Sequence, residues 1–266
     1  MGNLFYLYGI IPKKETETTP LPQLAGIDEK PIYTLSIGSV EAVVCDIRES
    51  EFNEQALEEK MTNAEWLQVK AFHHHEMLMT LHESYTVIPM KFCTIYESNA
   101  SLREKLESFT DSMAASLDFL SDKEEWNLKI YCDNTMLRTS IEEHSLTIDE
   151  KKKEIESLSP GRQFLEKKKL DKIIDQEADK EKEYFSAGLH DELKASSIKN
   201  EVKKNWNKDV TGRSEEMCWN SVYLIQESDT EGFLAKLKAL KEKYEASGWQ
   251  LELTGPWPAY HFAKLA

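Results

Sequence analysis

The apolar positions of the first 125 residues predict several strands ahead of two helices. Residues 4–10 are apolar on both alternating faces, which is typical of a central strand. Residues 32–35 and 40–47 alternate on either side of Gly38-Ser39 and predict a β-hairpin. Residues 85–88 form a further short run that favours a strand. This half of the chain therefore has an α+β pattern.

Each of the two predicted helices has one apolar face. Thr62–Glu65 and Ser101–Glu104 have the spacing of capping boxes, which open helices. The apolar positions of the first helix are Leu67, Ala71, His74, Leu78 and Leu81, and those of the second are Leu102, Leu106, Phe109, Met113, Leu117 and Leu120. We expect Leu67, Leu78 and Leu81 to lie in the core. Residues 12–30, with their prolines, threonines and charges, predict a surface loop.

The second half predicts a strand, a long helical segment, a strand, a helix and a last strand. The strands are expected at residues 126–133, 217–226 and 249–254, and a capping box at Ser228–Glu231 opens the last helix. Between the first two strands, mixed charges dominate residues 166–183. Pairs three residues apart there favour an exposed helical segment, namely Glu166–Lys169, Glu177–Lys180 and Asp179–Lys182. The helix becomes more apolar at Phe185, Leu189 and Leu193, then at Val202 and Trp206, and Gly248 is a reasonable stop for the last helix.

This order predicts two domains and a tail. Residues 1–124 form the α+β domain. Residues 125–254 form an α/β sandwich with helices on one sheet face, close to a ferredoxin-like arrangement, with a long charged helical insertion. Residues 255–266 form a C-terminal tail rich in proline and aromatic side chains.

Charge and cysteine usage exclude several classes of protein. The net charge is −15, and residues 1–125 contribute −12 of it, so neither nucleic acid nor an anionic membrane is an attractive partner. No apolar stretch reaches the ~20 residues of a membrane-spanning helix. The four cysteines have no CxxC pairing, which fits reduced thiols in a cytoplasm rather than a zinc site or disulfide scaffold.

The histidines at 73–75 are the most prominent candidate for chemistry. Adjacent helical residues point in different directions, and only His75 and His82 share a face, two turns or roughly 10 Å apart. A metal-dependent enzyme at His73–His75 is therefore the weakest of our hypotheses, and His74 is better explained as a partly buried core residue. The sequence has no nucleophile elbow and no phosphate-binding glycine loop. We expect no catalytic residue, no metal and no cofactor.

The C-terminal tail carries the most specific local pattern. Pro256 and Pro258 fix φ and remove two hydrogen-bond donors, so this segment is extended. The aromatic residues Trp257, Tyr260 and Phe262 allow two interpretations. They dock the tail on the protein's own surface, or they form an exposed anchor for a partner.

Short motifs along the whole chain have a distinctive order and spacing. They are Tyr6–Ile10, His75-Glu76, Val87–Phe92, Glu125–Lys129, Gly161–Leu165, Asn220–Ile225 and Leu253–Phe262. Together these segments resemble one known family, the gas vesicle GvpL/GvpF proteins. Three positions depart from the family pattern. Cys93 replaces a usual glycine, which puts a positive φ there in doubt, Ala259 replaces the second proline of a pair, and Ser221 replaces an alanine.

The resemblance implies a non-enzymatic assembly factor or minor structural protein of gas vesicles, the gas-filled protein shells that provide buoyancy. It implies binding to the small hydrophobic A-type shell subunit and to other gas vesicle accessory proteins, in the cytoplasm and at the vesicle. It also implies two α+β domains, the second a modified ferredoxin-like domain, with the tail folding back. An alternative is an adaptor that links other accessory proteins without touching the shell subunit.

Overall fold

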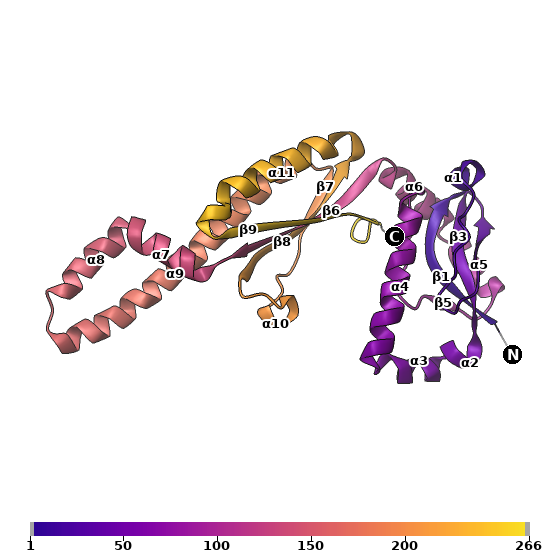
Figure 1. Ribbon diagram of the computed structural model, residues 1–266. Coiled ribbons are helices and arrows are strands. Elements are labelled where there is room, and N and C mark those ends of the chain that lie inside the picture. Colours follow the sequence, from indigo (N-terminus) through magenta and orange to yellow (C-terminus); the bar gives the residue numbers. More distant parts are fainter. Residues whose placement is uncertain (1–2, 264–266) are drawn as a thin grey trace. The chain divides into compact units, whose positions relative to one another are not determined.

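The computed structural model describes residues 3–263, which divide into two compact units (Figure 1). The first unit is made from Met1–Glu125 and Pro256–Ala266, and the second from Trp126–Gly255. Both combine helices with a β-sheet, so the predicted α+β class is confirmed. The tail from Pro256 onward belongs to the first unit rather than forming a separate body.

The sheet of the first unit is built around β1 (Asn3–Pro12). Its strand order is β2-β3-β1-β4, and β5 also pairs with β1. The other strands are β2 (Ile32–Ile37), β3 (Val40–Arg48), β4 (Ile88–Pro89) and β5 (Ile95–Tyr96). Strand β1 pairs antiparallel with β3, and Tyr6, Leu7 and Tyr8 in β1 are fully buried. A strand covered on both faces needs apolar side chains at every position, which confirms the prediction for residues 4–10.

Six helices surround this sheet in the described part of the unit. They are α1 (Lys13–Thr18), α2 (Glu49–Phe52), α3 (Glu54–Met61), α4 (Ala64–His82), α5 (Asn99–Glu107) and α6 (Thr110–Leu120). The predicted loop at residues 12–30 was wrong where α1 lies. The single stripe from Leu102 to Leu120 is divided between α5 and α6, because the helix breaks at Ser108 and Phe109.

Caps and core positions of these helices differ in detail from the sequence prediction. Helix α4 is capped by Asn63, whose side chain accepts the backbone N–H of Trp66, and not by Thr62. Helix α5 begins after Ser98, which forms a capping box with Ser101. Leu78 and Leu81 are fully buried as predicted, whereas Leu67 is only partly buried.

The second unit has a four-stranded sheet in the order β7-β8-β6-β9. Its strands are β6 (Lys123–Cys132), β7 (Lys199–Val202), β8 (Glu216–Gln226) and β9 (Trp249–Trp257). The apolar pattern does not predict β7, and it assigns Val202 to a helix, which is wrong. All four residues of β7 are exposed, so this edge strand lacks the apolar alternation that reveals a buried strand.

Helices and short turns complete the second unit. They are α7 (Asn134–His144), α8 (Leu146–Glu156), α9 (Pro160–Lys194), α10 (Lys208–Thr211), η1 (Glu227–Asp229), α11 (Thr230–Tyr244) and η2 (Glu245–Ser247). The capping box predicted at Ser228 is absent, because Ser228 lies in the turn η1 and Asp229 precedes α11 without a side-chain cap. Gly248 has φ +82° and ends η2, as its sequence position predicts.

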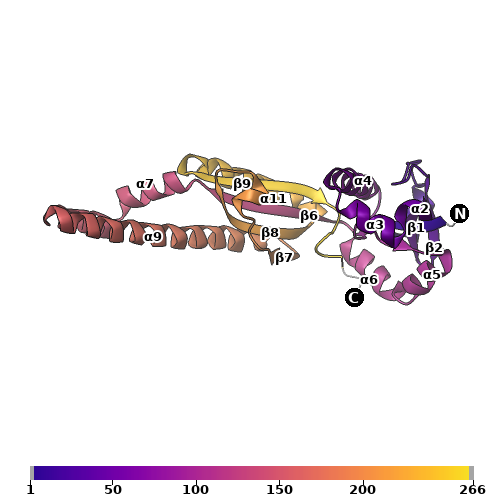
Figure 2. The ribbon, with the colours of Figure 1, turned by 90° about the horizontal axis from the view of Figure 1, so that it is seen from below.

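The two halves of helix α9 have different surroundings (Figures 1 and 2). Its second half packs with α11 on the sheet, where Leu189 and Leu193 share one core with Tyr223 and Phe233. Its first half forms a hairpin with α8 that projects beyond the sheet. The three ion pairs predicted from the charge spacing are present, Glu166–Lys169, Glu177–Lys180 and Asp179–Lys182. The expected exposure is incomplete, because Leu170, Ile174 and Ala178 are buried.

Candidate functional site

Helix α4 directs three consecutive histidines toward three different surroundings. Successive residues of an α-helix are rotated by about 100°, so neighbouring side chains diverge. His74 points into the core of the first unit and is 5% exposed, while His73 and His75 are partly buried. The helix thereby links the core strand β1 to the C-terminal tail.

His74 is held by hydrogen bonds at both ring nitrogens. Its Nε2 lies 3.0 Å from the carbonyl oxygen of Met90, which only accepts, so this nitrogen carries the hydrogen. Its Nδ1 accepts from the hydroxyl of Tyr6 at 2.8 Å. The pKa of His74 is lowered to about 4, chiefly by burial; the Met90 carbonyl opposes this shift, and the neighbouring His73 and His75 add to it. The ring therefore stays neutral near pH 7.

The two buried tyrosines of β1 satisfy the backbone around this helix. Besides its bond to His74, the Tyr6 hydroxyl accepts the backbone N–H of Cys93 at 3.1 Å. The Tyr8 hydroxyl accepts the N–H of Ile27 at 2.6 Å and lies 3.4 Å from Nε2 of His73. Burial lowers the pKa of His73 as well.

These bonds leave little room for a metal at His73–His75. A metal would have to displace the partners of His74, and the three rings do not converge. In residues 3–263 no group of three or more histidine, cysteine, aspartate or glutamate side chains has an arrangement that could hold a metal ion. None of the helices in the same residues has the length and apolar character needed to cross a membrane.

The tail docks on the first unit through small and apolar residues and one buried carboxylate. Pro258, Ala259 and Phe262 are buried. Glu125 is 1% exposed, and its two oxygens accept from Nδ1 of His261 at 2.6 Å and from the His261 backbone N–H at 2.9 Å. A buried carboxylate needs such partners to offset its lost hydration. These two bonds therefore fasten the tail.

Trp257 and Tyr260 lie on the outer side of the docked tail, against His75. The Tyr260 hydroxyl is 2.8 Å from Nδ1 of His75, and the ring centroids of His75 and Trp257 are 5.4 Å apart. Tyr260 is 39% exposed and Trp257 is partly buried. Burial, followed by the charge of Glu125, raises the pKa of the Tyr260 hydroxyl. The structure thus divides the five tail residues: Pro258 and Phe262 are buried, whereas Pro256, Trp257 and Tyr260 remain partly accessible.

Sequence reasoning missed the residues that receive the tail. Glu125 was one acidic residue among many, and no spacing relates it to His261, which lies 136 positions further on. The sequence offers His75 as a candidate metal ligand, and nothing in it indicates a contact with Tyr260. The only signal in the sequence for these two residues is the family resemblance, whose motifs include both His75 and Glu125.

A groove of about 620 Å³ lies beside the docked tail within the first unit. Most of its lining is apolar and comes from the segment that follows Val87. The lining residues are His74, His75, Ile88, Pro89, Met90, Lys91, Phe92, Thr94, Tyr260 and Ala263. Cys93, in the same segment, has φ +62°. The expectation that a positive φ is doubtful at this position, because cysteine replaces the usual glycine, was therefore wrong. The bond from its N–H to Tyr6 helps to hold this conformation.

Comparisons with known proteins match gas vesicle proteins over nearly the whole chain. Residues 4–264 match the family model of the gas vesicle synthesis proteins GvpL/GvpF. Gas vesicle protein L of Streptomyces sp. (strain CB03234) is 24% identical over 248 residues, which are 92% of this chain and 88% of that protein. Gas vesicle protein L1 of Halobacterium salinarum is 24% identical over 99% of this chain and 91% of its own length.

Solved structures show the same fold. The crystal structure of the gas vesicle protein GvpF from Anabaena sp. PCC7120 has a TM-score of 0.74 at 17% identity, with both chains fully covered. That of GvpF from Microcystis aeruginosa has a TM-score of 0.67 over 99% of this chain and 100% of its own. Given a family model that spans nearly all residues, the chain belongs to the GvpL/GvpF family of gas vesicle synthesis proteins.

Proposed function

We propose that this protein is a non-enzymatic assembly factor or minor structural protein of the gas vesicle that binds the hydrophobic A-type shell subunit. The observation that carries the proposal is the apolar groove between the segment Ile88–Thr94 and Tyr260. Its volume of about 620 Å³ lies within the range of ~300–1,000 Å³ in which proteins bind ligands. Each apolar side chain buried there would contribute about 1.5–3 kcal/mol.

The charge of the chain supports a role in controlling association. A shell subunit with an exposed apolar face self-associates before a shell is nucleated. A protein with a net charge of −15 resists association with further copies of itself while it covers part of that face. In this proposal the protein acts in the cytoplasm and at the growing vesicle, its partners are the shell subunit and other accessory proteins, and it needs no metal or cofactor.

The tail residues have different roles in this proposal. Pro258 and Phe262 are buried and hold the tail in place. Pro256 keeps the preceding segment extended. Tyr260 lines the groove, and Trp257 presents aromatic surface against His75, which also lines it.

The domain division and the ferredoxin-like comparison also remain proposals. We propose domains at residues 1–124 and 125–254, with 255–266 as the tail. The boundary near residue 125 is supported by the two compact units. The ferredoxin-like description is supported by the sheet order β7-β8-β6-β9 and by the helices that follow β6 and β8.

Co-expression with a tagged A-type shell subunit, in a host without gas vesicles, tests the function. We expect the shell subunit to stay soluble and to co-purify with this chain in a fixed ratio. Thr94→Arg, which places a long charged side chain in the groove, should abolish co-purification without unfolding the protein. Tyr184→Ala is the matched control, because Tyr184 is 79% exposed on α9 and lies outside the groove.

The adaptor alternative makes a different prediction for the same experiment. Folded protein that fails to retain the shell subunit, but co-purifies with other accessory proteins, would favour an adaptor. Shell binding that survives Thr94→Arg would show that the groove is not the binding site.

A further inference from the structure

The helical hairpin of α8 and α9 buries some of its apolar side chains between the two helices and leaves others accessible to solvent. Ile148, Ile155, Leu170 and Ile174 form a small core between the two helices. Closer to the turn, Leu158 is only partly buried, and Leu165 is 59% exposed. Two packed helices cover only part of each other's apolar surface, and a third helix completes such an arrangement.

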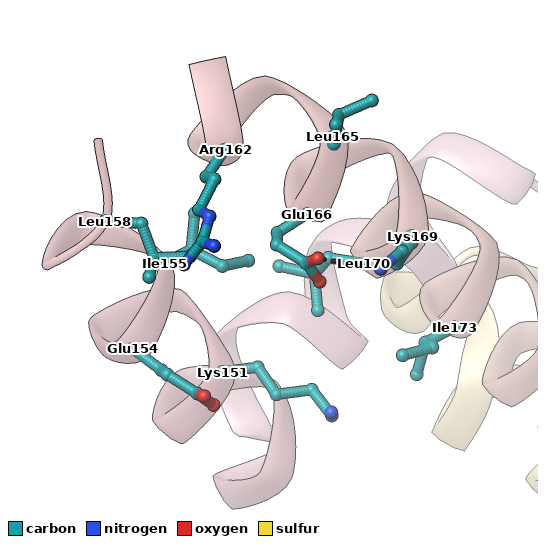
Figure 3. A pocket seen from close by; sticks show the side chains of 10 residues that line it. All are labelled: Lys151, Glu154, Ile155, Leu158, Arg162, Leu165, Glu166, Lys169, Leu170 and Ile173. Carbon is teal, nitrogen blue, oxygen red and sulfur yellow. Dashed lines mark hydrogen bonds and ion pairs between the residues drawn. The ribbon is translucent and has the colours of Figure 1, made fainter. Parts of the chain in front are cut away.

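A groove of about 550 Å³ runs between the two helices at this position (Figure 3). Its apolar lining consists of Ile155, Leu158, Leu165, Leu170 and Ile173, and its charged lining consists of Lys151, Glu154, Arg162, Glu166 and Lys169. Figure 3 shows the side chain of Arg162 reaching from α9 toward Ile155 and Leu158. Apolar and cationic groups therefore meet along one groove.

The hairpin holds this groove in a defined shape. The side chain of Gln163 donates to the carbonyl oxygens of Glu156 and Leu158 at 3.1 and 2.8 Å, which fixes the turn. Lys152 forms an ion pair with Glu142 of α7, and Arg138 of α7 pairs with Asp171 and Asp175 of α9. A preformed groove loses less conformational freedom when it binds a partner.

Two cations at the groove have no carboxylate partner among the residues that the structure describes. Lys169 pairs with Glu166, whereas neither Lys151 nor Arg162 forms an ion pair with another of residues 3–263. Glu154 also lies at the groove, so the lining has a net charge of +1. This positive lining contrasts with the net charge of −15 for the whole chain.

We propose that this groove, lined by Leu158, Leu165 and the cations Lys151 and Arg162, binds an amphipathic helix of a partner protein whose apolar stripe is flanked by carboxylates. The apolar stripe would pack on Leu158 and Leu165 and so complete a three-helix arrangement. The flanking carboxylates would pair with Lys151 and Arg162. The proposal concerns the second unit and does not depend on shell-subunit binding by the first.

Two labelled synthetic helices test the proposal with the full-length chain. Both carry leucines at i, i+3, i+4 and i+7 spacing. One carries glutamates beside this stripe and the other carries lysines. In fluorescence anisotropy we expect saturable binding of the glutamate peptide and roughly tenfold weaker binding of the lysine peptide, a preference that shrinks in high salt. No saturable binding, or equal binding of the two peptides, would overturn the proposal.

Variants locate the binding site. The double variant Lys151→Glu/Arg162→Glu should reverse the preference, so that the lysine peptide binds more tightly. Lys238→Glu/Lys241→Glu makes the same change of net charge at exposed positions of α11 and should leave the preference unchanged. Leu165→Ser should weaken both peptides several-fold without lowering the melting temperature, because Leu165 is mostly exposed.

Sedimentation of the chain alone tests whether a second copy of this chain, rather than a partner helix, occupies the groove. A monomer at micromolar concentration supports a groove that is open for a partner helix. A dimer that Leu165→Ser dissociates would overturn the proposal, since a second copy of this chain would then fill the groove.

Discussion

Replacing His74 by glutamine should remove a large part of the acid sensitivity of the first unit. The pKa of His74 is lowered from 6.5 to about 4 in the folded protein, chiefly by burial. Between these two values the unfolded chain binds more protons than the folded one. The free energy of unfolding therefore falls as the pH falls, and the loss is complete below pH 4.

The magnitude follows from the two pKa values. Each pH unit between them is worth about 1.4 kcal/mol, so protonation costs the folded state about 3 kcal/mol in all. Between pH 7 and pH 5 the same linkage gives about 2 kcal/mol. His73 and His82, whose pKa values burial also lowers, add to the loss in the wild-type protein. The difference between wild type and variant isolates the share of His74.

Glutamine keeps the hydrogen-bond pattern without the titration. Its amide can donate to the Met90 carbonyl and accept from Tyr6, as the ring does. The proteins are equilibrated in urea at pH 7 and at pH 5 and then pulse-labelled with deuterium at one fixed pH. Mass spectrometry of peptides from β1 then reports how much of the first unit is unfolded.

We expect the wild type to lose about 2 kcal/mol more than His74→Gln between pH 7 and pH 5. His144→Gln is the control, because His144 is exposed in the second unit, and it should keep the wild-type response. Equal pH dependence of His74→Gln and wild type would refute the argument that burial holds this ring neutral.

Three further substitutions test the packing. Gly26→Ala would place a methyl group 2.6 Å from the Cys45 sulfur and should lower stability by about 1–3 kcal/mol, so an unchanged melting temperature would contradict the close contact. Ile174→Ala should cost about 2–5 kcal/mol within the hairpin of α8 and α9, seen as faster hydrogen exchange in these helices, while β1 exchanges as before. Trp257→Ala should lower stability by only about 1–2 kcal/mol, because the side chain is partly exposed and a fully buried indole would cost more. A larger drop in melting temperature would show that the indole belongs to the core.

Local patterns predicted those parts of the molecule whose structure depends on near neighbours in the chain. Strand β1 is apolar on both faces because both faces of the sheet are covered at this strand, so that Tyr6, Leu7 and Tyr8 are all fully buried. The hairpin at Gly38 follows from a residue that accepts φ +60°. The three ion pairs of α9 follow from helical spacing alone. These features need only a few consecutive residues to be specified.

Elements without such a pattern were missed or misplaced. Strand β7 is an exposed edge whose ladder to β8 depends on β8 being already in place. The break between α5 and α6 lies inside a continuous apolar stripe, so periodicity could not reveal it. Competing caps one to three residues apart, such as Thr62 and Asn63 or Ser98 and Ser101, are equally plausible from residue type.

The sequence by itself determined the fold class, the central strand, the charged helix and, through its motifs, the family. The tertiary structure alone decided which groups meet across long separations. His261 reaches Glu125 and Tyr260 reaches His75 only because the tail packs back on the first unit. The groove between α8 and α9 likewise exists only because two helices leave one side of their apolar surface uncovered. Such contacts depend on burial and geometry in three dimensions, which no spacing along the chain encodes.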